Sequence, residues 1–399
     1  NGGLKRRINK LDIRFDRAWA EVDLDNIAHN IKKVRGLTGK TTKIMAVVKA
    51  DAYGHGVADT ASTLLENGAD RLAVSIIDEA IQLRKKGFDV PIQVLSHTFP
   101  GRAGEILDHN IIQTIFNLEL AEELSIEAIK RKVRAVVHIK VDTGMTRVGF
   151  PVDREGLLMI ERICRLPGLE VEGIMTHFAS ADEREDEYTA IQFERFMGIC
   201  GRLKAMSIHI PLRHVANSAA VINFPHMHLE MVRPGIILYG LMPAKGMDET
   251  CISLKPAMSL KANVININNV AKNTCVSYGR IFSTKRKSRI ITVPIGYADG
   301  YSRVLSMKGR VLVGGEFAPV VGNICMDQCM ADVTDIEKDI NIGDEEVLFG
   351  KHGERQIFVE EIAELIGTIN YEVVCIIGRR VPRVYLRNGG VVKVHNYLI

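Results

Sequence analysis

The stretch that decides the fold is Ile44-Met45-Ala46-Val47-Val48-Lys49-Ala50-Asp51-Ala52-Tyr53-Gly54-His55-Gly56. Its first five residues form a nearly continuous apolar run, which is typical of a strand buried on both faces. Lys49 closes this run, and a loop with two glycines, a tyrosine and a histidine follows. Burial of a lysine amine is costly and shifts it toward the neutral form that Schiff-base chemistry requires. Lys49 is therefore a candidate functional residue; a lysine that only extends its amine from the strand end into solvent is the alternative.

Seven further apolar runs follow this one, and amphipathic segments separate them. Eight strand candidates that alternate with helices are the number that a closed (β/α)8 barrel of the TIM type requires. An open doubly wound sheet is the alternative, and the absence of a G-x-G-x-x-G turn after any of the runs counts against it. The predicted strands are residues 44–49, 72–75, 92–95, 111–116, 135–141, 171–177, 213–216 and 231–238.

The sequence pattern changes at about Leu254. From there on, short runs alternate between apolar and polar residues, and glycine and asparagine turns separate these runs. This pattern predicts a mainly-β domain, with a strand over 262–270 among others, one helix at 358–367 and a closing hairpin at 384–394. We predict three parts: an N-terminal extension and strand that joins the β domain (1–22), a barrel (23–253) and a C-terminal β-rich domain (254–399). Asp23 is placed to cap a helix from Leu24 to about Val34.

The composition is that of an ordinary globular protein. Of the 399 residues, 46% are hydrophobic and 25% are charged, and the formal net charge is +4. No block of like charge indicates a nucleic acid or a membrane surface as a partner, and no apolar run has membrane-spanning length. The basic start of the chain is not followed by an apolar core, so a signal peptide is not expected. The seven cysteines are scattered without a C-x-x-C pair, so neither a zinc ribbon nor a disulfide framework is indicated, and the reducing cytoplasm fits best.

Chemically suggestive residues follow the predicted strands at their carboxyl ends, where barrel enzymes carry their active sites. Besides Lys49, residues 142–147 follow the fifth strand, His177 ends the sixth and Gly235 interrupts the eighth. Asn217 and Ser218 follow the seventh strand before a helix start, where they can cap the helix, bind an anion or do both.

His226 and His228 are a possible metal-binding pair on a proline-containing loop. No third ligand is evident in the sequence, so no metal site is predicted.

Several motifs resemble those of one known family, the alanine racemases, which are barrel-type (fold-type III) pyridoxal phosphate enzymes. The specific ones are K-A-D-A-Y-G-H-G at 49–56 and C-M-D-Q at 325–328, and the resemblance extends from Trp19 to the end. It implies pyridoxal 5'-phosphate as cofactor, carried by Lys49. Racemisation requires two bases on opposite faces of a planar intermediate. The resemblance implies Lys49 and Tyr278, in V-S-Y-G-R at 276–280, as these bases.

The resemblance also implies the residues around the cofactor. Arg233, in V-R-P-G-I at 232–236, faces the ring nitrogen, and an arginine cannot accept a proton from that nitrogen. His177, with Arg147, supports the phenol of Tyr278. Taken singly, Tyr278 would be a core aromatic and His177 an ordinary strand-end histidine. The residues assigned to the phosphate are Tyr53, Asn217, Ser218, Gly235, Ile236 and Tyr371. Taken singly, Tyr371 would be a packed aromatic.

The substrate carboxylate is assigned to Arg147 and to the backbone amide of Met326 in the same way. Lys140 is carbamylated in relatives and steadies the arginine, although it can also be an ordinary ion-pair lysine. Supporting positions are Asp327 and Tyr297, the latter as a gate of the access channel. The sequence departs from the commoner family pattern at two places, with Thr146 where glycine is frequent and Asn323 where arginine is frequent.

The resemblance thus implies a homodimer with shared active sites that interconverts L- and D-alanine to supply peptidoglycan synthesis. Amino-acid decarboxylation is a second possibility, but its enzymes place an acid at the ring nitrogen, whereas this chain has Arg233. A non-catalytic cofactor-binding barrel is a third, and it would lack the β region that holds Tyr278. Serine racemisation stays open, because one hydroxyl is a small difference in a pocket.

Overall fold

The computed structural model describes residues 17–399 and divides into two compact units. The barrel unit comprises Ile27–Tyr53 and Val57–Lys255. The β unit comprises the described residues up to Asn26, Gly54–Gly56 and Pro256–Ile399. Residues 1–16 of the predicted N-terminal extension lie outside the described residues, and the predicted division at 22/23 and 253/254 stays a prediction.

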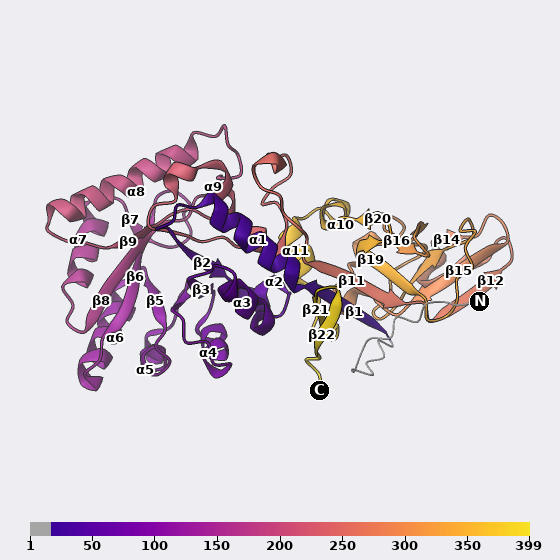
Figure 1. Cartoon of the computed structure of the whole chain (residues 1–399), viewed down its shortest axis with the longest axis horizontal. Coiled ribbons are helices and arrows are strands. Elements are labelled where there is room, and N and C mark those ends of the chain that lie inside the picture. Colours follow the sequence, from indigo (N-terminus) through magenta and orange to yellow (C-terminus); the bar gives the residue numbers. More distant parts are fainter. Residues whose placement is uncertain (1–16) are drawn as a thin grey trace. The chain divides into compact units, whose positions relative to one another are not determined.

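The barrel unit contains a sheet of parallel strands in the order β10-β2-β3-β4-β5-β6-β8-β9, with helices outside the strands (Figure 1). The sheet is nearly closed, because the backbone N–H of Arg233, after β10, donates to the carbonyl of Ala216, after β9, over 2.9 Å. The predicted eight-stranded barrel is confirmed. Its strands are β2 (Lys43–Val47), β3 (Arg71–Val74), β4 (Ile92–Val94), β5 (Ile112–Ile115), β6 (Ala135–Asp142), β8 (Leu169–Met175), β9 (Leu212–His214) and β10 (Met231–Val232), with the short β7 (Phe150–Pro151) beside β6.

The helices of this unit follow the strands in the expected alternation. Asp23 caps the first of them, since its Oδ1 accepts from the backbone N–H of Asn26 over 3.0 Å. That helix continues to Leu37, beyond the predicted end at Val34. The helices are α1 (Leu24–Leu37), α2 (Lys49–Tyr53), α3 (Val57–Glu66), α4 (Ile77–Lys85), α5 (Ala103–Asp108), α6 (Leu118–Arg131), α7 (Arg154–Cys164), α8 (Tyr188–Ala205) and α9 (Ser218–Asn223).

Seven of the eight predicted strands end earlier than the sequence indicated, and two of these differences bear on the site. The first ends at Val47, so Lys49 begins a turn and does not lie in the strand. The eighth is a strand only over Met231–Val232, because Pro234 has no N–H to continue the ladder, and a 3₁₀ turn at Ile236–Tyr239 follows.

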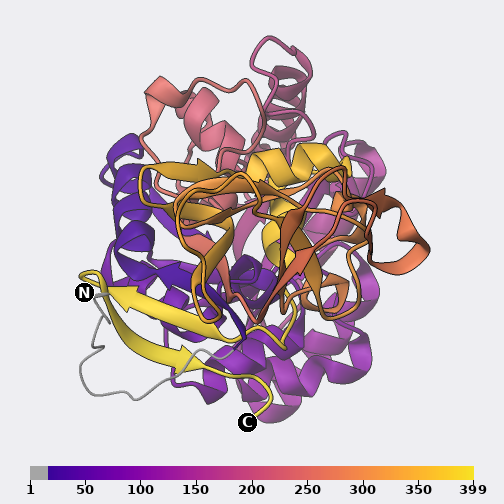
Figure 2. The same ribbon diagram turned by 90° about the vertical axis from the view of Figure 1, so that its right-hand side faces the viewer.

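The β unit is built on a mixed sheet in the order β17-β16-β19-β11-β1-β21-β22, with β20 paired to β19. The strand β1 lies inside this sheet, antiparallel to β11 and parallel to β21. Figure 2 shows the predicted hairpin β21–β22 in yellow. The strands of this sheet are β1 (Ala18–Asp23), β11 (Met258–Asn263), β16 (Arg310–Val313), β17 (Glu316–Pro319), β19 (Glu345–His352), β20 (Arg355–Ile357), β21 (Arg383–Arg387) and β22 (Gly390–His395).

Smaller elements complete the β unit. The run 262–270, which reads as one strand in the sequence, is divided between β11 and β12, which belong to different sheets. Helix α10 (Val359–Ile366) was predicted, whereas α11 (Asn370–Cys375) was not. The remaining strands are β12 (Asn266–Val270), β15 (Ser288–Val293) and β18 (Cys329–Asp332) in one sheet, and β13 (Cys275–Val276) with β14 (Phe282–Ser283).

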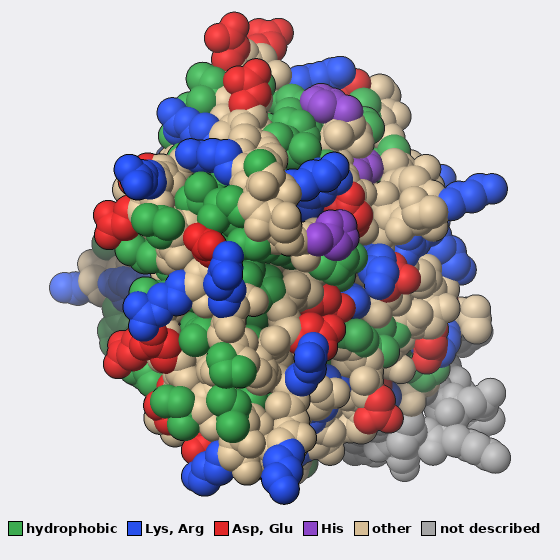
Figure 3. Space-filling model, turned by 90° about the vertical axis from the view of Figure 1, so that its left-hand side faces the viewer, with side chains coloured by type: hydrophobic (Ala, Val, Ile, Leu, Met, Phe, Trp, Pro, Cys, Tyr) green, Lys and Arg blue, Asp and Glu red, His purple; other side chains and the backbone are tan. Residues whose placement is uncertain are grey.

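The surface of the described chain carries charges of both signs. The face drawn in Figure 3 shows acidic and basic side chains interspersed, without a large area of one sign. Among the helices of residues 17–399, none has the length and apolar character needed to cross a membrane.

Candidate active site

Lys49 lies at the carboxyl end of β2, at the start of a left-handed turn. The φ angles of the next four residues, Ala50 to Tyr53, are 51°, 53°, 56° and 52°. The left-handed conformation costs about 1–2 kcal/mol per residue for L-amino acids, so four in succession require support from their surroundings.

Side-chain carboxylates supply part of that support. Glu79, in the first turn of α4, accepts from the backbone N–H of Ala50 over 2.6 Å and of Ser75 over 2.8 Å. Asp51 accepts from the N–H of Val57 over 2.7 Å. Glu79 thus joins the loop after β2 to the loop after β3. Sequence reasoning did not identify Glu79, because an acid in the first turn of a helix is common on electrostatic grounds alone.

Gly235, Ser218 and Tyr53 are brought together by three different loops of the barrel unit. The backbone N–H of Gly235 donates to Ser218 Oγ over 2.8 Å, and a Cβ at Gly235 would lie 2.5 Å from the Tyr53 hydroxyl. A side chain at position 235 would therefore fill the space between two hydroxyl groups. This arrangement of hydroxyls and backbone amides fits a phosphate group.

Asn217 and Ile236 flank this cradle. The Asn217 side chain accepts from the N–H of Ala220 over 3.0 Å and so caps α9, as one of its two predicted roles requires. Ile236 is fully buried at the start of the 3₁₀ turn.

Arg233 is almost completely buried and its guanidinium meets only neutral acceptors. Its Nη1 donates to the carbonyl and the Nδ1 of His214, over 2.7 and 3.0 Å. Its Nη2 donates to the carbonyls of Thr176 and Val215, over 2.7 and 3.2 Å, and lies 3.4 Å from Nδ1 of His177. Burial lowers the pKa of Arg233 to about 9, so the guanidinium is charged at neutral pH.

Lys140 and His177 lie at the carboxyl ends of β6 and β8, in a positively charged surrounding. Burial, with the charges of Arg233 and Arg147, lowers the pKa of Lys140 to about 8. Burial and the charge of Arg233 also hold the pKa of His177 well below its usual value, so its ring is neutral at pH 7. The cations that converge here suit an anionic ligand.

Arg147 itself is exposed, at the end of a loop that Asp142 organises. The Asp142 carboxylate accepts from the N–H groups of Gly144 and Thr146, over 2.9 and 3.0 Å. Thr146 has a φ of 55°, a conformation that a β-branched residue rarely adopts. This explains why glycine suits the position, and Asp142 offsets part of the strain in this chain.

Three predicted residues of the β unit lie together on its surface. The exposed fractions are 72% for Tyr278, 42% for Tyr297 and 53% for Met326. Asn323 Nδ2 donates to the Tyr278 carbonyl over 2.7 Å, and the N–H of Tyr297 donates to the Cys325 carbonyl over 3.1 Å. The interpretation of Tyr278 as a core aromatic is therefore wrong, and Asn323 anchors its loop.

Two further predicted residues belong to this unit. Asp327 accepts from Arg380 Nη2 over 2.7 Å. Tyr371 is partly buried in the first turn of α11.

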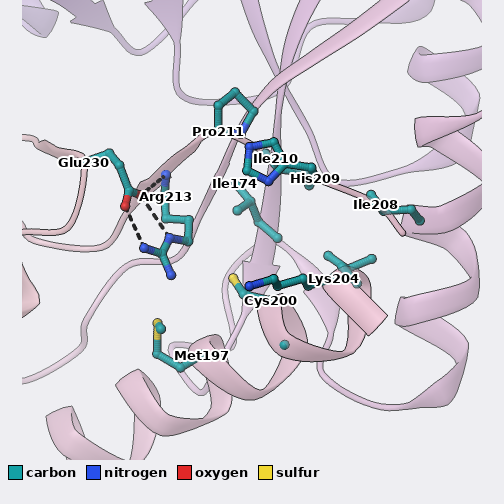
Figure 4. A pocket seen from close by; sticks show the side chains of 12 residues that line it. Ile174, Met197, Cys200, Lys204, Ile208, His209, Ile210, Pro211, Arg213 and Glu230 are labelled. Atoms are coloured by element: carbon teal, nitrogen blue, oxygen red, sulfur yellow. Dashed lines mark hydrogen bonds and ion pairs between the residues drawn. The ribbon is translucent and has the colours of Figure 1, made fainter. Parts of the chain in front are cut away.

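A cavity of about 460 Å³ lies elsewhere, between the C-terminal half of α8 and the residues that precede β9 (Figure 4). At its side Arg213 forms three hydrogen bonds to the Glu230 carboxylate, from its backbone N–H over 2.9 Å, from Nε over 2.9 Å and from Nη2 over 2.6 Å. None of the predicted site residues lines this cavity. Its loop at 208–211 lies before a strand, whereas barrel enzymes carry their active sites after the strands.

The described residues contain no group of three or more histidines, cysteines or acids that could hold a metal ion. His228 Nε2 lies 3.0 Å from the carbonyl of Val221, which satisfies the ring locally.

A parallel (β/α)8 barrel with a lysine and an anion cradle at the carboxyl ends of its strands, together with a mainly-β unit, defines the class of two-domain barrel-type enzymes. The sequence matches the family "Alanine racemase, N-terminal domain" over residues 22–243 and "Alanine racemase, C-terminal domain" over residues 257–385. The chain belongs to the alanine racemase family.

Individual relatives cover nearly the whole chain. The alanine racemase of Clostridium tetani is 49% identical over 381 residues, which are 95% of this chain and 98% of that protein. The solved alanine racemase of Clostridium difficile has a TM-score of 0.92 at 41% identity and covers 98% of this chain and 100% of its own. That of Bacillus anthracis, with bound L-Ala-P, has a TM-score of 0.91 at 38% identity, over 97% and 99% of the two chains.

Proposed function

We propose that the protein interconverts L-alanine and D-alanine with pyridoxal 5'-phosphate as its cofactor. The observation that carries the proposal is the cradle of Tyr53, Ser218 and Gly235, which lies at the same end of the barrel as Lys49 and the buried Arg233. Membership of the alanine racemase family supports the same reaction and substrate.

The residues present fit this cofactor. The Lys49 amine would hold it covalently, and Arg233 would donate a hydrogen bond to its ring nitrogen. The phosphate would be held by Tyr53, Asn217, Ser218, Gly235, Ile236 and Tyr371. When bound, pyridoxal phosphate withdraws electrons from the amino acid and makes its Cα proton acidic. Because Arg233 is a donor only, the ring nitrogen stays unprotonated, which argues against the decarboxylase alternative.

Two groups of the chain would move the Cα proton. Lys49 acts on one face of the substrate and the Tyr278 phenol on the other. A phenol has a pKa of about 10, so it needs donors or positive charge nearby to act as a base near neutrality. We assign the positive charge to Arg147 and a hydrogen bond to His177, whose neutral ring cannot supply charge.

The substrate carboxylate would be held by Arg147 and by the backbone N–H of Met326. We propose that Lys140, as a carbamate, steadies Arg147, and that Tyr297 and Asp327 shape the access to the site. The exposed position of Tyr278 supports a homodimer in which the phenol serves the partner's barrel. We further propose a cytoplasmic enzyme that supplies D-alanine for peptidoglycan.

The first test incubates the purified protein with pyridoxal phosphate and L-alanine or L-serine, and follows D-alanine and D-serine by chiral chromatography. We expect D-alanine to form faster than D-serine. Borohydride reduction and peptide mapping should place the cofactor on Lys49. Absence of D-alanine, or label on another lysine, contradicts the proposal.

The two bases are distinguished by Tyr278→Phe, which removes only the phenolic hydroxyl. This variant should still exchange the Cα hydrogen of D-alanine with deuterated solvent. Exchange into L-alanine should fall by about 10²–10⁴-fold, the usual contribution of a general base. Equal loss for both enantiomers, with cofactor bound, would show that another residue is the second base.

A further inference from the structure

A chain of hydrogen bonds runs from Arg233 through the interior of the barrel. Arg233 Nη1 lies 3.0 Å from His214 Nδ1, and His214 Nε2 lies 2.7 Å from His138 Nδ1. His138 Nε2 lies 2.9 Å from Glu172 Oε2, and the Glu172 carboxylate receives two hydrogen bonds from Arg71, over 2.6 and 2.7 Å. Both histidines are completely buried. The chain thus connects the predicted ring-nitrogen partner to side chains on β9, β6, β8 and β3.

The direction of every proton in this chain is fixed by its ends. A guanidinium has five donors and no acceptor, so His214 Nδ1 must accept from Arg233 and His214 must carry its proton on Nε2. That proton is donated to His138 Nδ1, and so His138 carries its own proton on Nε2. Glu172, as a carboxylate, can only accept it. In this structure both ends therefore select the same tautomers of the two histidines, and reversing them would cost a hydrogen bond at each end.

The charges agree with this direction. Burial lowers the pKa of His138, and more strongly that of His214, so both rings are neutral at pH 7. Burial alone would raise the pKa of Glu172, but hydrogen bonds from His138 and Arg71 hold it far below its usual value. The carboxylate polarises His138, and through it His214, which makes His214 Nδ1 a stronger acceptor. Arg233, which meets no carboxylate among the described residues, gains from that acceptor.

We propose that His214, His138 and Glu172 are positioning residues for Arg233, and that Glu172 fixes the direction of the whole chain. With the opposite tautomer, an N–H of His214 would face an N–H of Arg233, and the guanidinium could not keep its place. The link to catalysis rests on the proposed function, because it assumes that Arg233 meets the cofactor ring. The tautomers themselves are independent of that assumption.

The direct test is nitrogen NMR of the protein labelled with ¹⁵N-histidine, with and without pyridoxal phosphate. Long-range ¹H–¹⁵N correlations identify which ring nitrogen carries the proton, and His138→Phe and His214→Phe assign the two signals. We expect both rings to be protonated only at Nε2. A proton at Nδ1 of His214 overturns the proposal. This measurement gives the tautomers even if the protein has no racemase activity. A failure of this proposal can therefore be told apart from a failure of the proposed function.

The second test is Glu172→Gln, because an amide offers both a donor and an acceptor to His138 and therefore permits either direction. Glu230→Gln is the matched control: Glu230 also receives two hydrogen bonds from a guanidinium, that of Arg213, as well as one from the backbone N–H of Arg213, but no histidine among the described residues donates to it (Figure 4). In Glu172→Gln the reversed tautomers lose a hydrogen bond only at the Arg233 end, so we expect them to appear at both histidines in a mixture with the original tautomers. The kcat should fall about 10- to 100-fold, the size of one hydrogen bond to a charged group, with a smaller change in KM.

For Glu230→Gln the tautomers and kcat should stay as in the wild type. Glu172→Asp, which is again an acceptor only, should restore the single tautomer. Two results contradict the role of Glu172: a single unchanged tautomer in Glu172→Gln, or equal loss of kcat in Glu172→Gln and Glu230→Gln.

Discussion

Lys140 is the residue whose chemistry depends most directly on its surroundings. Its pKa of about 8 arises from burial and from Arg233 and Arg147. Below about pH 8 the amine is protonated and cannot react with CO2, and above it the neutral amine attacks the carbon of CO2, forms an N–C bond and releases one proton. We therefore expect carbamate on Lys140 to increase from pH 7 to pH 9. Carbon NMR with ¹³C-bicarbonate measures it directly.

Lys261 is an internal control for this prediction. It is also buried, which alone would lower its pKa, but ion pairs with Glu21 and Glu345 raise it instead. Lys261 should therefore carry no carbamate over the same pH range. A carbamate resonance that persists in Lys140→Arg would contradict the assignment.

For single residues, the sequence shows which of them follow a strand, but it does not show which side chains they contact. Lys49 and Arg233 stand out because charged groups follow apolar runs. No role could be assigned to His138 and His214 from the sequence. Their role depends on their contacts with each other and with Glu172, and the three residues lie on three separate strands. The exposure of Tyr278 could not be predicted either, because a tyrosine beside a short strand is usually packed in the core.

Among the elements, the left-handed turn at Ala50–Tyr53 receives part of its support from Glu79, which lies on another helix. Glu79→Ala removes the acceptor of Ala50 and Ser75, which should cost about 2 kcal/mol, as for a hydrogen bond to a charged group. Hydrogen exchange followed by mass spectrometry should show faster exchange in the peptide that contains residues 48–57. Cofactor affinity should fall together with it.

Glu155→Ala is the control for this prediction, because Glu155 is an acid in the first turn of α7 and so has a comparable helix position. It should leave exchange at 48–57 unchanged. Unchanged exchange in Glu79→Ala as well would show that Asp51 and the surrounding packing hold the turn without Glu79.

Most of the elements follow from hydrophobic periodicity, and the exceptions have local causes. The eight barrel strands are visible because buried parallel strands are apolar on both faces. The division of 262–270 between two sheets is not visible, because periodicity shows the existence of a strand and not its partners. Helix α11 is too short to give a helical pattern, with only six residues.

For the whole molecule, the predicted homodimer gives a mixing experiment. Lys49→Ala and Tyr278→Phe should each be inactive as homodimers. If each site uses Lys49 of one subunit and Tyr278 of the other, a heterodimer has one intact site. Random exchange should then restore about one quarter of the wild-type activity, because half of the dimers are mixed and each has one of two sites.

Subunit exchange must be demonstrated in the same sample, for instance with two affinity tags. Full exchange without recovery of activity would place Lys49 and Tyr278 of each site in one subunit. Recovery in the absence of exchange would indicate contamination by wild-type enzyme.

The position of β1 has a consequence for the order in which the protein is made. This strand is synthesised before the other described strands, yet it pairs with β11 and β21, which are translated roughly 240 and 360 residues later, or tens of seconds at ribosomal rates. The segments of the barrel unit are complete before then, so that unit can fold on the ribosome while β1 still has both edges unpaired. Unpaired edges invite wrong pairing with other chains. In the newborn polypeptide β1 is therefore exposed to aggregation until β21 has left the ribosome.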